Sequence, residues 1–258
     1  MSAEHGHPAF ISGGARGIGA AIAHELHRRG HPVAIGDLRV QEARERAAAI
    51  AAEAPIQAPV LAVSLDVCER RSVEDALAEC QERLGPIAVL VNNAGHDELV
   101  PFVQTDEDFW QRIIEINFKG ALRVTRALLP GMIERRYGRI VSISSDAARV
   151  GSSLESVYAG AKAALIAFTK TIARETARSG VSANIVCPGP TRTPLLDQLR
   201  QPGEQGGEAL IEAMIRAVPM RRLAEPDEIA HAVGFFASER SGYITGQTLS
   251  VSGGLTMA

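Results

Sequence analysis

Short apolar runs that end in polar or glycine-containing segments alternate with helical patterns along this chain. The first run, residues 8–12 (PAFIS), passes through the turn GGARGIG into an amphipathic pattern that ends at Gly30. Such runs are typical of strands buried on both faces, and alternation with helices is typical of parallel strands joined by right-handed crossovers. Further strands are predicted at 33–37, 59–67, 87–95, 138–144, 182–188 and 247–254.

The alternation predicts an α/β fold of the Rossmann type, a doubly wound parallel sheet of about seven strands with helices on both faces. The 258 residues, 46% of them apolar, are enough to bury such a sheet. No internal repeat or linker divides the chain, so residues 1–258 are predicted to form a single dinucleotide-binding domain.

Charge and cysteine content narrow the partners and the compartment. The formal net charge of −3 predicts no attraction to nucleic acid or to an anionic membrane, and no apolar run is long enough to span a bilayer. The chain enters a strand almost at once, leaving no room for a signal peptide. Three cysteines without metal-ligand spacing and two N-terminal histidines without partners predict no metal site and a reducing, cytoplasmic setting.

Polar and glycine residues gather at the predicted carboxyl ends of the strands, where doubly wound sheets bind ligands. Gly13, Gly17 and Gly19 lie where the first strand turns into a helix, a geometry that directs backbone N–H groups at a phosphate. Asp66 ends the third strand, where its carboxylate could meet an adenine amino group. This shared edge predicts a dinucleotide site.

Asp37 ends the second strand, about twenty residues beyond the glycines. A carboxylate there accepts hydrogen bonds from ribose hydroxyls and repels a 2′-phosphate, which favours NAD over NADP. Two alternatives stay open. Asp37 could simply cap the helix predicted over 40–53, and Arg16 or Arg39 could accept a phosphate.

A second group of residues can carry proton transfer. Ser144 and Ser145 end the fifth strand, and Tyr158 and Lys162 lie four residues apart on one face of the next predicted helix. An ammonium group beside a phenol favours the phenolate and so lowers the phenol pKa from about 10, which predicts a general acid or base. Adjacent strand residues face opposite sides, so only one of Ser144 and Ser145 is expected to face Tyr158. The alternative is a core aromatic and a solvated lysine.

Three further segments belong to the predicted site. Asn117 lies among apolar neighbours in the helix predicted over 106–129, where a buried amide needs partners. The prolines and glycine of 188–193 open the sixth strand into a loop. Residues 194–222 are irregular and too long for an ordinary connection, which predicts a substrate lid.

Over nearly its whole length the chain resembles the short-chain dehydrogenase/reductase family. Residues 12–19 (SGGARGIG) resemble its glycine motif with serine for the usual threonine, residues 92–95 match its N-N-A-G, Tyr158 to Lys162 matches Y-x-x-x-K, and Ser145 has the common spacing from Tyr158. The resemblance implies cofactor contacts from Ser12, Gly13, Arg16, Gly17, Ile18, Gly19, Asp37, Leu38, Asp66, Val67, Asn93, Ala94, Gly95, Tyr158, Lys162, Pro188, Gly189, Thr191 and Thr193.

The resemblance also implies a mechanism. Tyr158 exchanges a proton with the substrate oxygen while hydride passes between nicotinamide and carbon, and Ser145 hydrogen-bonds that oxygen. Lys162 lowers the tyrosine pKa and holds the nicotinamide ribose, and Asn117 anchors a water that relays protons to Lys162. Family members commonly form homotetramers, and the apolar C-terminal strand fits packing on a neighbour.

Several stretches, among them NNAGHD and SSDAARVGSS, are similar to the 2-hydroxycyclohexanecarboxyl-CoA dehydrogenases, which implies a secondary alcohol or ketone substrate and suggests a cyclic hydroxyacyl-CoA. Pocket contacts are expected from His96, Asp146, Arg149 and Leu195. A second hypothesis is an NADPH-dependent 3-oxoacyl reductase acting on an acyl-carrier or CoA thioester. A third, of another class, is a non-catalytic dinucleotide sensor.

Overall fold

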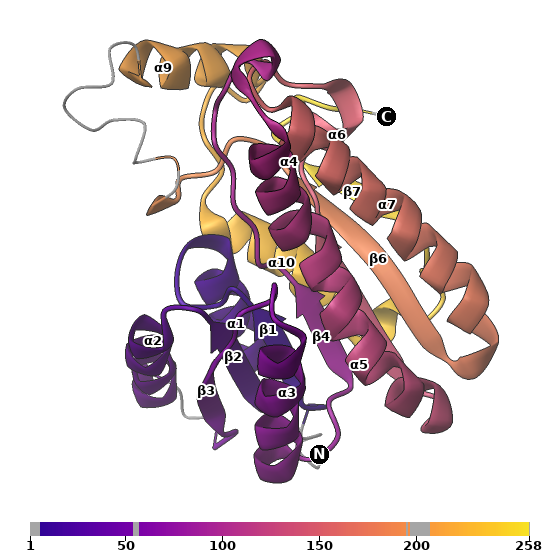
Figure 1. The fold of residues 1–258 in the computed structure, drawn as a ribbon. Coiled ribbons are helices and arrows are strands. Elements are labelled where there is room, and N and C mark those ends of the chain that lie inside the picture. The colour runs from indigo at the N-terminus through magenta and orange to yellow at the C-terminus, as the bar shows by residue number, and fades with distance from the viewer. Residues whose placement is uncertain (1–5, 54–56, 195, 197–206, 258) are drawn as a thin grey trace.

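In the computed structural model, which describes residues 6–53, 57–194, 196 and 207–257, seven parallel strands form one sheet with the order β3-β2-β1-β4-β5-β6-β7 (Figure 1). The strands are β1 Ala9–Ser12, β2 Val33–Asp37, β3 Val60–Ser64, β4 Val89–Asn92, β5 Gly138–Ile143, β6 Val181–Pro188 and β7 Thr248–Val251. The predicted Rossmann-type architecture is confirmed.

Helices and helical turns fill the connections. They are α1 Gly17–Arg28, α2 Val40–Glu53, α3 Arg70–Leu84, η1 Phe102–Gln104, α4 Glu107–Ile114, η2 Glu115–Lys119, α5 Gly120–Glu134, α6 Ala147–Val150, α7 Ser156–Thr176, η3 Ala177–Ser179, α9 Gly207–Ala217, α10 Pro226–Ala237 and η4 Glu239–Ser241. No helix within the described ranges is long and apolar enough to cross a membrane.

Strand order reverses beside β1, which pairs with β2 on one side and with β4 on the other. Ser12 at the end of β1 is in register with both Gly36 and Asn92, so the segments that leave these three strands begin side by side. This is the switch point at which doubly wound sheets bind ligands.

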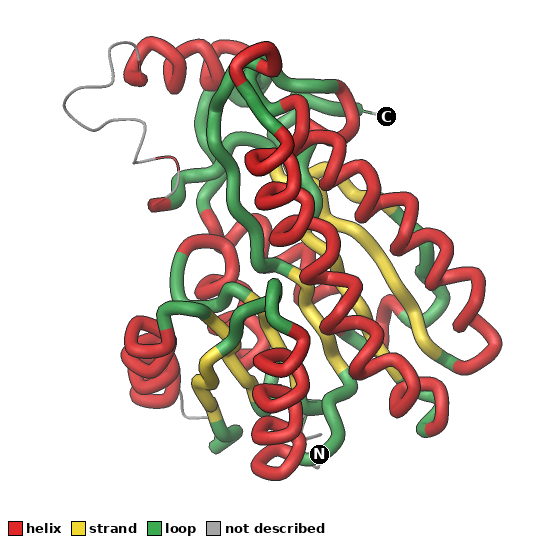
Figure 2. Tube along the Cα trace, in the orientation of Figure 1, coloured by secondary structure: helices red, strands yellow, loops and turns green. Residues whose placement is uncertain are grey.

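The sheet is buried on both faces, which explains the continuous apolar runs in the sequence. Alternate residues of β1 enter different cores: Ile11 packs with α1, α2 and α10, and Phe10 packs with α3 and α5. Figure 1 shows α3, α5 and α7 in front of the sheet and α1 and α10 behind it, and Figure 2 shows the strands enclosed between these helices. Burying each large side chain contributes about 1.5–3 kcal/mol.

The helix predicted over 106–129 is longer and less regular than expected. It is capped by Asp106, whose Oδ1 accepts from the Phe109 N–H at 2.8 Å, and its middle turn, η2, is a π-helix. Gly120, the first residue of α5, packs closely against Val67: a Cβ on Gly120 would lie 2.8 Å from Val67 Cγ2. Segment 194–222, predicted as irregular, contains the helix α9.

Candidate active site

The glycine-rich turn and the segment after β4 are joined by hydrogen bonds. The Ser12 hydroxyl accepts from the backbone N–H groups of Asn93 at 3.1 Å and Ala94 at 3.2 Å. In return, Asn93 Nδ2 donates to the Ser12 and Gly13 carbonyl oxygens at 3.1 and 2.7 Å. Gly13 has φ of +70°, and a Cβ there would lie 2.8 Å from Ala94 Cα, so only glycine fits this approach.

The N-terminus of α1 leaves donors for a ligand. Arg16 is the N-cap residue in an extended conformation, and its side chain makes no capping hydrogen bond within the described part of the chain. The opening N–H groups of a helix have no intrahelical partner, and together with the helix dipole they favour a phosphate. Ile18, in the same turn, packs against the core that includes Ile11.

Asp37 serves the backbone around it. Its Oδ2 accepts from the Ala15 N–H at 3.0 Å and its Oδ1 from the Arg39 N–H at 2.9 Å, so it holds the glycine-rich turn and caps the approach to α2. The next residue, Leu38, is exposed. At the end of β3, Asp66 Oδ1 likewise accepts from the Cys68 N–H at 2.8 Å, and the adjoining Val67 is buried.

The two serines after β5 have different environments. Ser144 is buried, and its hydroxyl donates to the Lys162 carbonyl oxygen at 2.9 Å. Ser145 is partly exposed, and its hydroxyl lies close enough to the Tyr158 phenol to lower the phenol pKa. The structure therefore brings Ser145, rather than Ser144, to Tyr158.

Lys162 is buried, with 3% of its surface exposed, and its Nζ donates to the Ile143 carbonyl oxygen at 3.0 Å. The same Nζ lies 5.7 Å from the centre of the Tyr158 ring. Gly95 packs against both Lys162 and Asn117, since a Cβ on it would lie 3.1 Å from Nζ and 3.0 Å from the Asn117 Oδ1. Serine, tyrosine, lysine and asparagine thus converge at one place.

Asn117 lies in the π turn and bridges two segments. Its Nδ2 donates to the His96 carbonyl oxygen at 2.7 Å and to the Ile113 carbonyl oxygen at 2.9 Å, and its Oδ1 accepts from the His96 N–H at 3.2 Å. A π turn inside an α-helix frequently marks a functional position. Here it directs a buried amide at the segment after β4.

The ionisation of Tyr158 differs from the sequence-based expectation. Desolvation by the surrounding protein is the largest influence and raises the phenol pKa above its ordinary value, although part of the Tyr158 surface is exposed; Asp97 and Glu155 raise the pKa further. Burial also lowers the pKa of Lys162 to about 8, against the attraction of Asp97. The expectation of a lowered phenol pKa is therefore wrong for the chain alone, because desolvation penalises both charged forms.

Two residues absent from the sequence-based site stand beside it. Asp97 follows the N-N-A-G segment, and Glu155 is the N-cap residue of α7, three positions before Tyr158. Their positions in the sequence, an acid next to each motif, were the available signal. Nothing in the sequence showed that the segment after β4 meets the start of α7.

The expected pocket residues have varied surroundings. His96 Nε2 pairs with Glu98 at 2.9 Å. Asp146 is almost completely buried, and its Oδ1 accepts from the Ser250 hydroxyl at 2.6 Å, while Arg149 donates to the same Ser250 oxygen at 2.7 Å. These contacts tie the segment after Ser145 to β7. Leu195 lies outside the described residues, as do 197–206 of the predicted lid.

The loop after β6 reaches the glycine-rich turn. Pro188 ends β6, and Gly189 packs against Ser252, because a Cβ at that position would lie 2.8 Å from the Ser252 Cα. Thr191 donates to the Gly189 carbonyl oxygen at 2.8 Å. Thr193 faces Gly17, where an added Cβ would meet its Cγ2 at 3.5 Å. The loop therefore lies against the start of α1.

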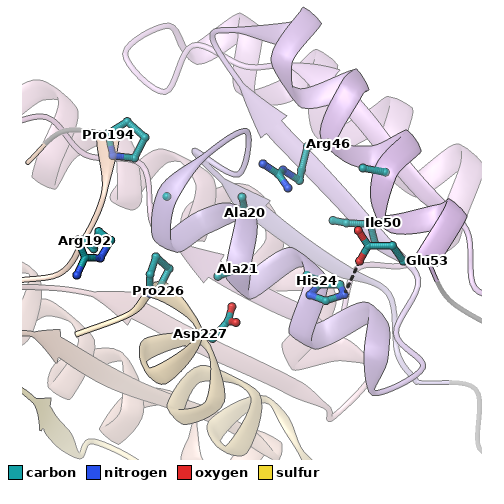
Figure 3. A pocket seen from close by; sticks show the side chains of 12 residues that line it. Ala20, Ala21, His24, Arg46, Ile50, Glu53, Arg192, Pro194, Pro226 and Asp227 are labelled. Carbon is teal, nitrogen blue, oxygen red and sulfur yellow. Dashed lines mark ion pairs between the residues drawn. The ribbon is translucent and has the colours of Figure 1, made fainter. Parts of the chain in front are cut away.

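A pocket of about 400 Å³ lies between α1, α2, the loop after β6 and the start of α10 (Figure 3). Figure 3 shows His24 of α1 paired with Glu53 of α2, and Arg192 near Pro226. Of its lining residues only Gly17 belongs to the predicted cofactor set. Ser145, Tyr158 and Lys162 do not line it, so we give this pocket no part in the chemistry.

Comparison with known proteins identifies the family. The family model described as Enoyl-(Acyl carrier protein) reductase matches residues 13–256. Oxidoreductase UcpA of Salmonella typhimurium is 38% identical over 254 residues, covering 98% of this chain and 95% of that protein. The 3-oxoacyl-[acyl-carrier-protein] reductase FabG of Escherichia coli (strain K12) is 36% identical over 251 residues, covering 96% of this chain and 97% of that protein.

A solved structure of actinorhodin polyketide ketoreductase with NADPH superposes with a TM-score of 0.89 at 30% identity, covering 97% of each chain. Fold and family model together define an oxidoreductase that acts on carbonyl or alcohol groups with a nicotinamide dinucleotide. The chain belongs to the short-chain dehydrogenase/reductase family.

Proposed function

We propose that the chain transfers hydride between NAD(H) and a secondary alcohol or ketone, with Ser145, Tyr158 and Lys162 at the reacting carbon. One observation carries this proposal. The Tyr158 phenol lies close to the Ser145 hydroxyl, and the Lys162 ammonium lies over its ring, at the edge of the sheet where the glycine-rich turn also opens. Hydroxyl, phenol and ammonium together provide a donor to the substrate oxygen and a group that can take up or release its proton.

The residues present fit a nicotinamide dinucleotide. The uncapped start of α1 offers N–H groups for the pyrophosphate, and the Asn93 amide holds the adjoining turn in place. When bound, the nicotinamide supplies or accepts hydride. In carbonyl reduction, Tyr158 donates its proton to the substrate oxygen while Ser145 donates a hydrogen bond to it. In alcohol oxidation the hydride transfer and the proton transfer run in the opposite direction, and Lys162 stabilises the phenolate that accepts the proton.

The oxygen and the nitrogen of the Asn117 side-chain amide are both hydrogen-bonded to the backbone of His96. We propose that Asn117 fixes the segment around His96 in this way. We extend its role to anchoring a water between this segment and Lys162. The Lys162 ammonium donates to the Ile143 carbonyl oxygen, and it and the Asn117 Oδ1 both lie beside Gly95, which supports a path for protons to it.

The cofactor proposed is NAD rather than NADP. Asp37 supports it, because its carboxylate stands at the end of β2 and repels a 2′-phosphate there. Against it stands the ketoreductase neighbour, whose structure was solved with NADPH. Comparing kcat/KM for NADH and NADPH tests the preference, and a strong preference for NADPH overturns it. Asp37→Ser is expected to narrow the difference in kcat/KM between NADH and NADPH. The same substitution also removes the carboxylate that accepts from the Ala15 N–H.

For the substrate we propose a cyclic hydroxyacyl-CoA and its ketone, as the stretches NNAGHD and SSDAARVGSS suggest. The second candidate is a 3-oxoacyl thioester, favoured by the names of two relatives, FabG and the acetoacetyl-CoA reductase of Shinella zoogloeoides. Kinetics with cyclic and linear 3-oxoacyl-CoA thioesters of matched carbon number separates them. A higher kcat/KM for the linear thioester selects the second.

Replacing Tyr158 with Phe tests the proposed chemistry. We expect turnover to be abolished while NADH still binds, because only the proton-transfer oxygen is removed. Tyr243→Phe is the matched control, since Tyr243 is fully exposed. Near-normal turnover of Tyr158→Phe contradicts the assignment. If the unmodified chain binds NADH yet oxidises none of a panel of cyclic and aromatic alcohols and CoA thioesters, the non-catalytic sensor is the better hypothesis.

We further propose that the chain works in the cytoplasm as a homotetramer and that segment 194–222 covers the substrate. The exposed Leu249 of β7 and Met257 near the C-terminus support association with a neighbouring copy. Sedimentation equilibrium measures the assembly directly. The amphipathic α9, with Ile211 buried on one side, supports a folded cover rather than a loose loop.

A further inference from the structure

Asp97 and Glu155 have carboxyl groups next to the proposed active site, and none of the roles given above uses them. They come from different elements: Asp97 from the segment after β4, and Glu155 from the residue before α7. A backbone hydrogen bond joins these two segments, because the Val100 N–H donates to the Leu154 carbonyl oxygen at 3.0 Å. The segments that carry both carboxyl groups are therefore in direct contact.

The backbone on either side is fixed. Leu154 has φ of +70°, a left-handed conformation that costs a residue with a side chain about 1 kcal/mol or more. Its bond to Val100 helps to hold that conformation and so places Glu155. On the other side, Asn117 holds His96 through both its N–H and its carbonyl oxygen, which places Asp97.

The two carboxyl groups form a pair. The Oδ1 atom of Asp97 is buried with no donor among the described residues, so a charge on this carboxyl group is poorly solvated where its segment meets that of Glu155. Burial, the largest influence, and the neighbouring Glu155 together raise the pKa of Asp97 to about 8, while Lys162 acts in the opposite direction. Two like charges this close cannot both ionise easily.

The charged and titratable groups that face Tyr158 come from three elements and the segments beside them. Asp97 approaches from the segment after β4, Glu155 and Lys162 from α7 and its cap, and Cys187 from β6, with the neutral Ser145 hydroxyl opposite. Asp97, Glu155 and Cys187 all disfavour a phenolate, and Ser145 favours it. The carboxyl pair is thus the main source of negative charge at the phenol.

We propose that Asp97 and Glu155 are positioning residues that act through Tyr158: their negative charge adds to burial in opposing loss of the phenol proton, and so shifts the pH range in which the tyrosine exchanges protons. This inference rests on the proposed role of Tyr158. The pair leaves the overall equilibrium between alcohol and ketone unchanged, since that belongs to the substrates. It moves the pH at which Tyr158 ionises, and with it the pH profile of turnover, upward.

The test follows Tyr158 itself and needs no substrate. The chain has only three tyrosines, so carbon-13 labelling at the ring carbon that bears the hydroxyl gives few NMR signals, and Tyr158→Phe assigns the relevant one. We compare the unmodified chain with Glu155→Gln and Asp97→Asn over the pH range in which circular dichroism shows each to be folded. Each variant keeps the shape of the side chain and removes its ability to ionise.

We expect the Tyr158 signal of either variant to move toward the phenolate position at a pH lower by roughly one unit or more, the usual effect of removing a close charge. Glu98→Gln is the matched control: it removes a neighbouring carboxylate that is paired with His96 and Arg112 instead, and it should leave the titration unchanged. Tyr158 curves that superimpose throughout the folded range, or an equal shift in Glu98→Gln, overturn the proposal.

The pH profile of kcat/KM gives a second readout once an alcohol substrate is in hand. The pH at which kcat/KM rises on the alkaline side should fall by the same amount as the pKa in the NMR titration. For each pH unit of that shift, the phenolate form is about tenfold more populated at a given pH. The two proposals fail separately. A shifted Tyr158 signal in a chain that turns over no substrate refutes the proposed function and leaves the pair intact, whereas normal turnover without a shift refutes the pair alone.

Discussion

Replacing Lys162 with Met should stabilise the fold while it removes activity. Only 3% of the Lys162 surface is exposed. Burial lowers the pKa of its ammonium group from 10.5 in the unfolded chain to about 8 in the folded one. That difference of about 2.5 units, at about 1.36 kcal/mol per unit, means that holding the charged lysine costs the fold about 3 kcal/mol near neutral pH. Met is similar in length and carries no charge.

One contact acts in the opposite direction. The Nζ atom donates to the Ile143 carbonyl oxygen at 3.0 Å, and leaving that oxygen without its partner costs about 1 kcal/mol. The net expectation is therefore a gain of about 2 kcal/mol in the free energy of unfolding. Between pH 8 and about 10.5 the unfolded chain binds the proton that the folded chain has lost, so the stability of the unmodified chain rises with pH in that window and the gain from Met disappears.

Urea unfolding without dinucleotide, followed by circular dichroism near neutral pH and at about pH 10, measures both effects. Lys170→Met is the matched control, because Lys170 is exposed on the same helix and its replacement should change little. The reasoning is refuted if Lys162→Met is less stable than the unmodified chain, or if its advantage is the same at both pH values.

Three further predictions concern the cofactor edge and the thiols. Gly19→Ala should reduce dinucleotide affinity at least about tenfold in a fluorescence titration, because its Cβ would overlap the Gly13 carbonyl oxygen and lie 2.5 Å from Asn93 Nδ2; unchanged affinity argues against this packing. Ser12→Ala should lower the unfolding free energy by about 2 kcal/mol through the two N–H groups it leaves unbonded, whereas Ser12→Thr should restore it; equal losses in both variants exclude the hydroxyl as the cause. Burial raises the pKa of Cys80 to about 12, so this thiol should resist alkylation near neutral pH until urea unfolds the chain, and rapid labelling of the native protein contradicts it.

The sequence alone was sufficient for the fold and for the edge at which the site lies. Buried strands and amphipathic helices are local patterns, and a parallel sheet places the carboxyl ends of all its strands at one edge. The glycine-rich turn, Asp37 and Ser145 follow three of these strands, so all of them had to lie along that edge. The preference for Ser145 over Ser144 combined strand alternation with the family's common spacing to Tyr158, and the structure turns Ser144 away to the Lys162 carbonyl oxygen.

Only the tertiary structure decided the ionisation of the site. The spacing of Tyr158 and Lys162 predicted a cation that lowers the phenol pKa, but a pKa depends on every charge and every desolvating group nearby, and these come from distant parts of the chain. Asp97 reaches Glu155 because a π turn and a left-handed residue bring the segment after β4 onto the start of α7. No periodicity encodes such a contact between irregular segments, whereas the helices and strands that carry them are encoded residue by residue.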